Sequence, residues 1–222
     1  MAEPRTRPFD PTECHHLVVT GWAGRDSASV EAHIRELEAV GLPRPTRTPI
    51  FYRAAASLLT ASDAIQVVGG DTSGEVEFVL VNLSDGLWVG LGSDHTDRAL
   101  ERTSVALSKQ VCAKVVSRDL WKFEDVADHW DQLELRSWAH RDGERVPYQD
   151  GTVAAILPPD RLLTLCEDNG PPLAAGTLVF SGTIAAIGGV SPADEFEMEL
   201  HDPVLERTLT HQYRITALPV VC

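Results

Sequence analysis

Three carboxylates within a pair of β-forming segments constrain the fold of this chain more than any other feature. They lie in the stretch from Gly74 to Arg98, which reads GEVEFVLVNLSDGLWVGLGSDHTDR. Glu75 and Glu77 are two residues apart in a run rich in valine, leucine and phenylalanine. Because side chains alternate along a strand, both carboxylates are expected on one face, roughly 6.5 Å apart along the strand.

The third carboxylate, Asp94, reaches the same patch if this stretch folds as a hairpin. Asp85-Gly86 is typical of a two-residue type I′ turn, and it predicts the register of the two strands. The pairs counted outward from this turn are Ser84 with Leu87, Val81 with Gly90, Phe78 with Ser93 and Glu77 with Asp94.

Such a patch calls for a positive charge. Like charges facing each other in a sheet repel, and the cost is roughly 3 kcal/mol at about 5 Å and an effective dielectric constant of about 20. A hard divalent cation, Mg²⁺ or Mn²⁺, fits best, because carboxylate oxygens satisfy it and leave octahedral positions for water and substrate. The alternative interpretation is a solvated strand face whose acids never meet.

The size and net charge of the chain limit the classes of protein to which it can belong. It has 222 residues, of which 43% are hydrophobic and 23% are charged, enough for one sizeable core. We expect a single soluble domain over residues 1–222, with residues 1–13 as an arm over the body or a frayed end. No apolar stretch approaches the roughly 20 residues that span a bilayer. The net charge of −14 argues against nucleic acid and anionic membrane surfaces as partners.

The four cysteines are scattered without a C-x-x-C pair, which indicates neither a zinc site nor a disulfide framework. The first residues, MAEPRTRPFDP, lack the apolar segment of a signal peptide. A reducing cytoplasm is therefore the expected location.

The rest of the chain predicts many short strands and a few helices. Ser27 is expected to cap a helix that runs through Val40 and ends at Gly41 and Pro43. A second helix should begin near Thr96 or Asp97. Further elements are an amphipathic helix over 123–133 and a hairpin that turns at Asp142-Gly143. These predictions favour an α+β, β-rich fold.

Other polar residues are better explained by structural roles than by catalytic ones. Glu195, Glu197 and Glu199 form a second same-face row, but nothing apolar frames them as a cleft, so we expect a strand face protected by charge. His129 is more easily explained as a structural residue than as a catalytic one.

The hairpin motif resembles the metal-binding core of the fumarylacetoacetate hydrolase superfamily, in which an E-x-E pair and an N-D-x-x-x-R segment hold Mg²⁺ or Ca²⁺. This resemblance implies Glu75, Glu77 and Asp94 as metal ligands and Arg98 as the motif arginine, which would contact substrate. Ser93 stands where the motif has asparagine.

A second segment, GTLVFSGTIAAIGGV from Gly176 to Val190, resembles the G-D-x-x-x-x-G-T-[PI] strand and turn of the same family and implies Thr183 as a substrate contact. The two segments have the order and spacing of the family's catalytic domain. The resemblance implies a rolled, mixed β-sandwich and a homodimer.

Three further residues are candidates for the site. The family has a lysine downstream of the aspartate motif that polarises a substrate carbonyl, and Lys109 is the choice here, although Lys114 also lies within reach. Tyr52 is a candidate substrate contact, with an ordinary packed tyrosine as the alternative. His95 follows the metal aspartate directly, and it is interpreted either as the proton-transfer group or as a support that steadies the Asp94 loop.

These residues predict a Mg²⁺-dependent enzyme that acts on a small 2-oxo acid or β-dicarbonyl compound through a metal-stabilised enolate. Family hydrolases also use a His and Glu pair on a lid to activate water, and no such pair is found by motif. Its absence favours decarboxylation, isomerisation or hydration over C–C hydrolysis. The alternatives are a non-catalytic metal-binding or ligand-binding protein of the same fold and a purely structural domain.

Overall fold

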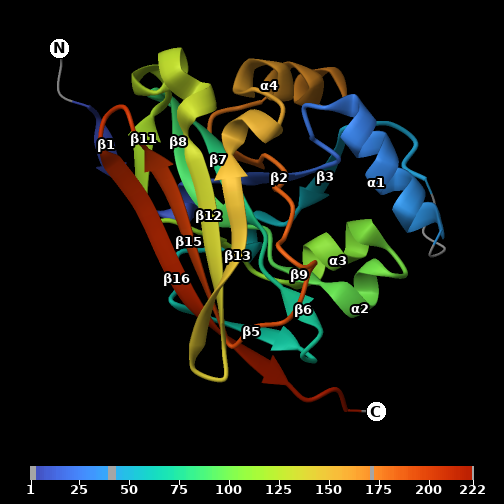
Figure 1. The fold of residues 1–222 in the computed structure, drawn as a ribbon. Helices are drawn as coiled ribbons and strands as arrows, with labels where there is room; N and C mark the ends of the chain where they lie inside the picture. The colour runs from blue at the N-terminus through green and yellow to red at the C-terminus, as the bar shows by residue number, and fades with distance from the viewer. Residues whose placement is uncertain (1–3, 40–43, 171–172, 222) are drawn as a thin grey trace.

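Two β-sheets stacked face to face build the body of the protein (Figure 1). The computed structural model describes residues 4–39, 44–170 and 173–221. Within these residues the first sheet has nine strands, with a main path β1 (Thr6–Pro8), β11 (Asp119–Lys122), β8 (Gly86–Ser93), β7 (Val76–Leu83), β14 (Thr177–Phe180), β2 (His16–Gly21) and β3 (Ile50–Ala54). Strand β10 (Lys114–Val116) pairs with β8 and with β4 (Leu59–Thr60).

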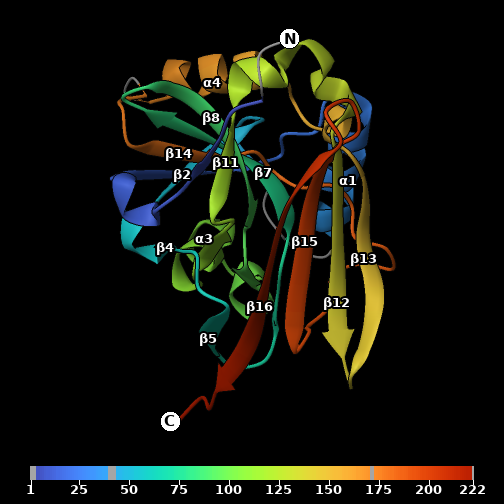
Figure 2. The same ribbon diagram turned by 90° about the vertical axis from the view of Figure 1, so that its left-hand side faces the viewer.

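The second sheet stands along one side of the molecule, as the rotated view in Figure 2 shows. Its strands, in order, are β13 (Glu144–Thr152), β12 (Glu134–Arg141), β15 (Glu195–Asp202), β16 (Arg207–Leu218) and β5 (Ala64–Val68). A short pair, β6 (Thr72–Ser73) and β9 (Thr96–Asp97), lies apart from both sheets. Parallel pairs occur in both large sheets, and the expected β-rich, mixed-sheet architecture is confirmed.

The helices are short and lie at the edges of this sandwich. They are α1 (Ser27–Ala39), α2 (Arg98–Glu101), α3 (Val105–Val111) and α4 (Pro159–Asp168). Figure 1 shows α2 and α3 gathered beside β6 and β9. No helix of the described chain is long and apolar enough to cross a membrane.

The ends of α1 and α2 can be compared with the expected caps. The Asp26 side chain accepts hydrogen bonds from the amides of Ala28 and Ser29 at 3.1 and 3.2 Å, so Asp26 caps α1 and Ser27 is its first residue. The predicted end of this helix at Gly41 and Pro43 lies outside the described residues. Asp97 caps α2, as the sequence predicts.

The amphipathic helix predicted over 123–133 is wrong. Two 3₁₀ segments, Phe123–Asp125 and Ala127–Gln132, take its place, with a kink at His129. A 3₁₀ helix has about three residues per turn, so it too can direct apolar side chains three or four residues apart toward the core. The Trp130 ring packs edge-on against Phe78 at 4.9 Å between ring centroids.

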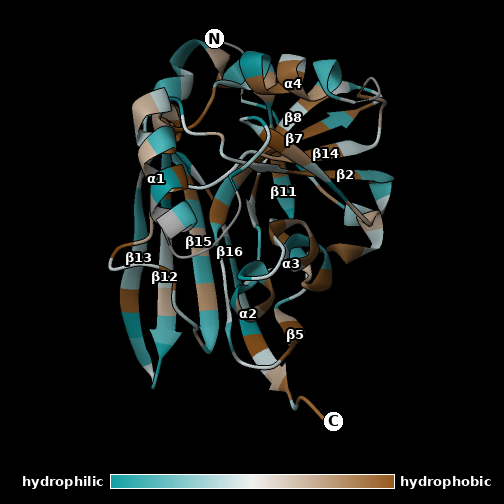
Figure 3. Ribbon diagram, turned by 90° about the vertical axis from the view of Figure 1, so that its right-hand side faces the viewer, coloured by the Kyte–Doolittle hydropathy of each residue, from teal (hydrophilic) through white to brown (hydrophobic). Residues whose placement is uncertain are grey.

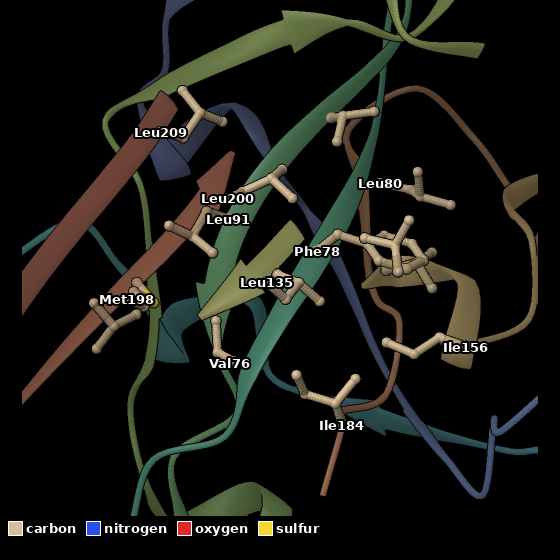
Figure 4. Close-up of a cluster of buried hydrophobic side chains, with 14 of the residues drawn as sticks. Val76, Phe78, Leu80, Leu91, Leu135, Ile156, Ile184, Met198, Leu200 and Leu209 are labelled. Carbon is tan, nitrogen blue, oxygen red and sulfur yellow. The ribbon is translucent and has the colours of Figure 1, made fainter. Parts of the chain in front are cut away.

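Both faces of the β7–β8 hairpin are buried. Figure 4 shows Phe78, Leu80 and Leu91 among side chains that include Leu135 and Leu200 of the second sheet. Val79 and Val81 point to the other face, toward a second apolar cluster inside the rolled first sheet. Figure 3 shows hydrophilic and hydrophobic residues alternating along the strands of the second sheet. The first sheet is therefore an interior layer, which explains why the β7 segment is almost wholly apolar.

The register of the hairpin differs from the prediction by two residues. Its loop is Ser84-Asp85, and Gly86, with φ of 115°, already pairs with Leu83. Glu77 consequently faces Gly92. Contacts of the turn with residues outside it explain the difference, because Asp85 accepts hydrogen bonds from the Trp88 indole at 2.9 Å and, through its carbonyl, from Lys122 at 2.6 Å. A shift of two residues preserves the face of each side chain, so the acids still converge.

Two other predictions concern the second sheet and the N-terminal arm. The β12–β13 hairpin turns at Asp142-Gly143, where both residues have positive φ as a type I′ turn requires. Glu195, Glu197 and Glu199 lie along the solvated side of β15, where Arg136 and Arg145 pair with Glu199 and Glu197. Within the predicted arm, strand β1 pairs with β11 and so lies over the body.

Candidate metal centre

Glu75, Glu77 and Asp94 converge at the end of the β7–β8 hairpin. Glu75 immediately precedes β7, Glu77 lies in it, and Asp94 immediately follows β8, where its amide donates to the Glu75 carbonyl at 3.0 Å. One carboxylate oxygen of each residue lies within 4.8 Å of the others. Glu77 and Asp94 are buried and Glu75 is half-buried. The structure thus brings together the three acids that the sequence singled out.

Two lysines neutralise Asp94 from opposite sides. The Nζ of Lys109, on α3, lies 2.6 Å from Asp94 Oδ2, and the Nζ of Lys114, on β10, lies 2.6 Å from Asp94 Oδ1. Lys109 also donates to Glu75 Oε2 at 2.9 Å, and Lys114 donates to the His95 carbonyl at 2.6 Å. Lys109 is therefore at the site, as chosen from the sequence, and Lys114 is there as well.

Arg98 completes the positive side of the cluster. Its guanidinium donates to Glu75 Oε1 at 2.9 Å, to Glu101 Oε2 at 2.8 Å and to the Ser73 hydroxyl at 2.8 Å. The Arg98 side chain, which the family resemblance assigned to a substrate contact, is thus engaged with two carboxylates of the protein itself. These contacts fix Arg98 as a holder of Glu75.

The three acids have different electrostatic surroundings. Burial raises the pKa of Glu75, but the charges of Lys109 and Arg98 outweigh this effect and lower the pKa to about 2. Burial and the charges of Asp94 and Glu75 raise the pKa of Glu77 well above its ordinary value. The Glu77 side chain accepts a hydrogen bond from the Gly182 amide at 2.7 Å, and no ion pair to it is found among the described residues. Burial opposes the charge of Lys109, yet Asp94 and Glu75 raise the pKa of its ammonium.

The donor set fits a hard divalent cation. Both Asp94 oxygens are buried, and each lies 2.6 Å from a lysine nitrogen, that of Lys109 or that of Lys114. All three residues offer carboxylate oxygens, which Mg²⁺, Mn²⁺ and Ca²⁺ prefer. Metal–oxygen bonds of about 2.1 to 2.4 Å place opposite ligands up to about 4.2 to 4.8 Å apart, and the three oxygens meet this limit.

The His95 ring contacts neighbouring hydroxyl groups rather than the three acids. Its Nδ1 lies 2.9 Å from the Tyr213 hydroxyl and its Nε2 lies 2.9 Å from the Thr72 hydroxyl. Burial, followed by the charges of Lys114 and Arg98, lowers the pKa of His95 to about 3. Both ring nitrogens are occupied and the ring is neutral, an arrangement that suits a supporting residue of the Asp94 loop better than a proton-transfer group.

A residue that sequence reasoning missed connects this loop to the second sheet. Tyr213 lies on β16, and its hydroxyl contacts both His95 and Ser93, the latter at 2.8 Å. Its burial is complete. No local motif signals this role, because Tyr213 occupies an ordinary inward position of an alternating strand.

Thr183 and Tyr52, the other two predicted substrate contacts, have different surroundings. Thr183 follows Gly182, whose amide binds Glu77, but its own hydroxyl donates to the Val76 carbonyl at 2.7 Å and accepts from Gln149 at 2.7 Å. Gly182 has φ of 90°, a conformation that favours glycine in this turn. Tyr52 is half-buried on β3, and burial raises the pKa of its hydroxyl, which the charge of Lys109 lowers in part.

Comparison with solved structures gives the class of fold. A yeast protein, ynq8, described as a fumarylacetoacetate hydrolase family protein, superposes with a TM-score of 0.66 at 17% identity, covering 95% of this chain and 96% of that one. 2-Keto-3-deoxy-D-arabinonate dehydratase gives 0.68 at 17% identity, covering 96% and 76%. The 2-hydroxyhepta-2,4-diene-1,7-dioate isomerase from Mycobacterium marinum gives 0.65 at 15% identity, covering 92% and 75%. The protein has the fold of the fumarylacetoacetate hydrolase family, as the sequence motifs indicate.

Within that fold the chain belongs to the family described as "Protein of unknown function (DUF2848)", which matches residues 20–213. No curated protein matches the sequence.

Proposed function

We propose that this protein is a divalent-metal-dependent enzyme that converts a small 2-oxo acid or β-dicarbonyl compound through its enolate. The observation that carries the proposal is the convergence of Glu75, Glu77 and Asp94 in one cluster, with a carboxylate oxygen of each within 4.8 Å of the others. The names of two structural neighbours, an isomerase of a 2-hydroxy-2-ene acid and a dehydratase of a 2-keto acid, support this class of substrate.

In this proposal Glu75, Glu77 and Asp94 hold Mg²⁺, Mn²⁺ or Ca²⁺. The bound cation would supply the electrophile that orients two substrate oxygens and stabilises the negative charge of the enolate. Arg98 keeps Glu75 ionised and in place, and Lys114 holds Asp94 in place. His95 and Tyr213 steady the loop from behind.

The remaining question is which reaction follows enolate formation. The candidates are decarboxylation, hydration, isomerisation and C–C hydrolysis, and decarboxylation and C–C hydrolysis are tested first.

Two substrates would separate these reactions. A 2,4-dioxo acid reports hydrolysis through loss of its ultraviolet absorbance, and a 2-oxo diacid reports decarboxylation through CO₂ release. Wild-type protein with Mg²⁺ should convert at least one of them, and oxalate, an enolate mimic, should inhibit. Asp94→Asn should lose most of the activity and most of the Mn²⁺ binding measured by calorimetry. Glu197→Gln, a carboxylate change on the solvated face of β15, is the matched control and should behave as wild type.

A wild-type protein that binds no divalent ion would refute the proposed enzyme and leave the structural alternative. Tight metal binding without turnover of either substrate class would favour a non-catalytic metal-binding protein.

A further inference from the structure

The ammonium of Lys109 already bridges two of the three proposed metal ligands. It lies 2.9 Å from Glu75 Oε2 and 2.6 Å from Asp94 Oδ2. The other oxygen of Glu75 binds Arg98 at 2.9 Å, and the other oxygen of Asp94 lies 2.6 Å from Lys114. Every oxygen of these two carboxylates therefore has a cationic nitrogen close to it.

A divalent ion that both residues coordinate must come close to at least one of these cations. Repulsion between like charges is strong over such distances in a buried site. Withdrawal of one nitrogen would relieve this repulsion, and the three cations differ in the contacts that they make outside the metal ligands.

Arg98 and Lys114 are held in place. Arg98 has three partners, Glu75, Glu101 and Ser73. Lys114 is completely buried on a strand, where it also donates to the His95 carbonyl. Neither can leave without abandoning a contact that does not involve a metal ligand.

Lys109 has the weakest contact outside the metal ligands. It projects from α3, a helix of seven residues whose outer side chains, Leu107 and Val111, are exposed. Its remaining hydrogen bond, to the Thr96 hydroxyl, is long at 3.3 Å. Glu101 lies close enough for its charge to act on Lys109, and that carboxylate offers an alternative partner. A four-carbon stem allows the ammonium to change partners without a shift of the backbone.

We propose that Lys109 competes with the metal ion for Glu75 and Asp94, so that its charge weakens ion binding. This inference rests on the proposed metal site. It makes Lys109 a determinant of metal affinity.

The test is a Mn²⁺ titration in which electron paramagnetic resonance reports the free ion. Lys109→Met removes the charge and keeps an apolar stem, and it should bind Mn²⁺ about tenfold or more tightly than wild type. Lys109→Arg retains a cation and should not gain affinity. Lys122→Met is the matched control, because Lys122 contacts Asp85 and Trp88 at the opposite end of the hairpin. It should bind as wild type does.

A second measurement uses wild-type protein and so does not depend on the folding of a variant. The chain contains three lysines, Lys109, Lys114 and Lys122, so ¹⁵N-lysine labelling yields a spectrum with one ammonium signal for each. Saturating Mg²⁺ should shift the Lys109 signal strongly and leave Lys122 in place.

The outcomes separate this inference from the metal site itself. Wild type that binds Mn²⁺ as tightly as a folded Lys109→Met, or a Lys109 signal insensitive to Mg²⁺ in a protein that binds it, overturns the competition and leaves the metal site intact. Absence of binding in wild type and in Lys109→Met overturns both.

Discussion

Replacing Lys114 with methionine tests whether the carboxylate cluster is held together by its own cations. Lys114 and Asp94 are both completely buried, and the lysine nitrogen lies 2.6 Å from Asp94 Oδ1 and from the His95 carbonyl. Removing one partner of a buried ion pair leaves the other charge uncompensated, at a typical cost of about 3–5 kcal/mol. Lys109 still faces the second Asp94 oxygen, so we expect a loss in the lower half of that range.

Such a loss is a large share of the roughly 5–15 kcal/mol that stabilises a domain of this kind. The assay is urea unfolding followed by the fluorescence of the five tryptophans and extrapolated to water. The measurement is made with a chelator present, because a bound ion adds stability to the folded state alone.

The double variant Asp94→Asn/Lys114→Met supplies the control. It removes both charges, so its loss of stability should be smaller than the sum of the two single losses by about 1 kcal/mol or more. Additive losses, or a loss below about 1 kcal/mol for Lys114→Met alone, would refute the argument that Lys114 neutralises Asp94.

Three further predictions follow from the surroundings of particular residues. His95→Gln should weaken Mn²⁺ binding and recover activity as Mg²⁺ is raised, whereas a drop in kcat of about 10²-fold with unchanged metal affinity would make His95 the proton-transfer group. Burial lowers the pKa of His211 below its usual 6.5, so the unfolded chain binds the proton first and stability falls as the pH drops through the ordinary histidine range. His211→Gln should show a shallower fall between about pH 7.5 and 5 in urea unfolding. Light scattering should give twice the chain mass if the protein is a homodimer, and the chain mass if it is not.

The convergence of the three acids could be predicted from the sequence because it depends on a local pattern. Glu75, Glu77 and Asp94 lie on the two arms of one hairpin, and alternation along a strand fixes which side chains share a face. The exact register was wrong, because the turn is determined by Trp88 and Lys122 rather than by its own two residues. The face was right, since the error was an even number of residues.

The surroundings of the acids depend on contacts that no local pattern encodes. Lys109 and Lys114 come from a helix and a strand that the chain reaches only after α2. Tyr213 comes from β16 of the second sheet, 118 residues from His95 in the sequence. Arg98 was found by motif, but Glu75 and Ser73, 23 and 25 residues away in the sequence, reach it only in the folded chain.

The charge balance of the cluster explains how one site can suit both a folded metal-free protein and a metal centre. Lys109, Lys114 and Arg98 face Glu75 and Asp94, and Glu77 has a raised pKa that favours its neutral form. The fold therefore does not need the ion to offset repulsion among the three acids. An incoming ion would favour ionised Glu77 and compete with Lys109 for Glu75 and Asp94. Substitutions at Lys109 should therefore change the metal affinity and also lower the stability of the fold, because Lys109 pairs with the buried Asp94.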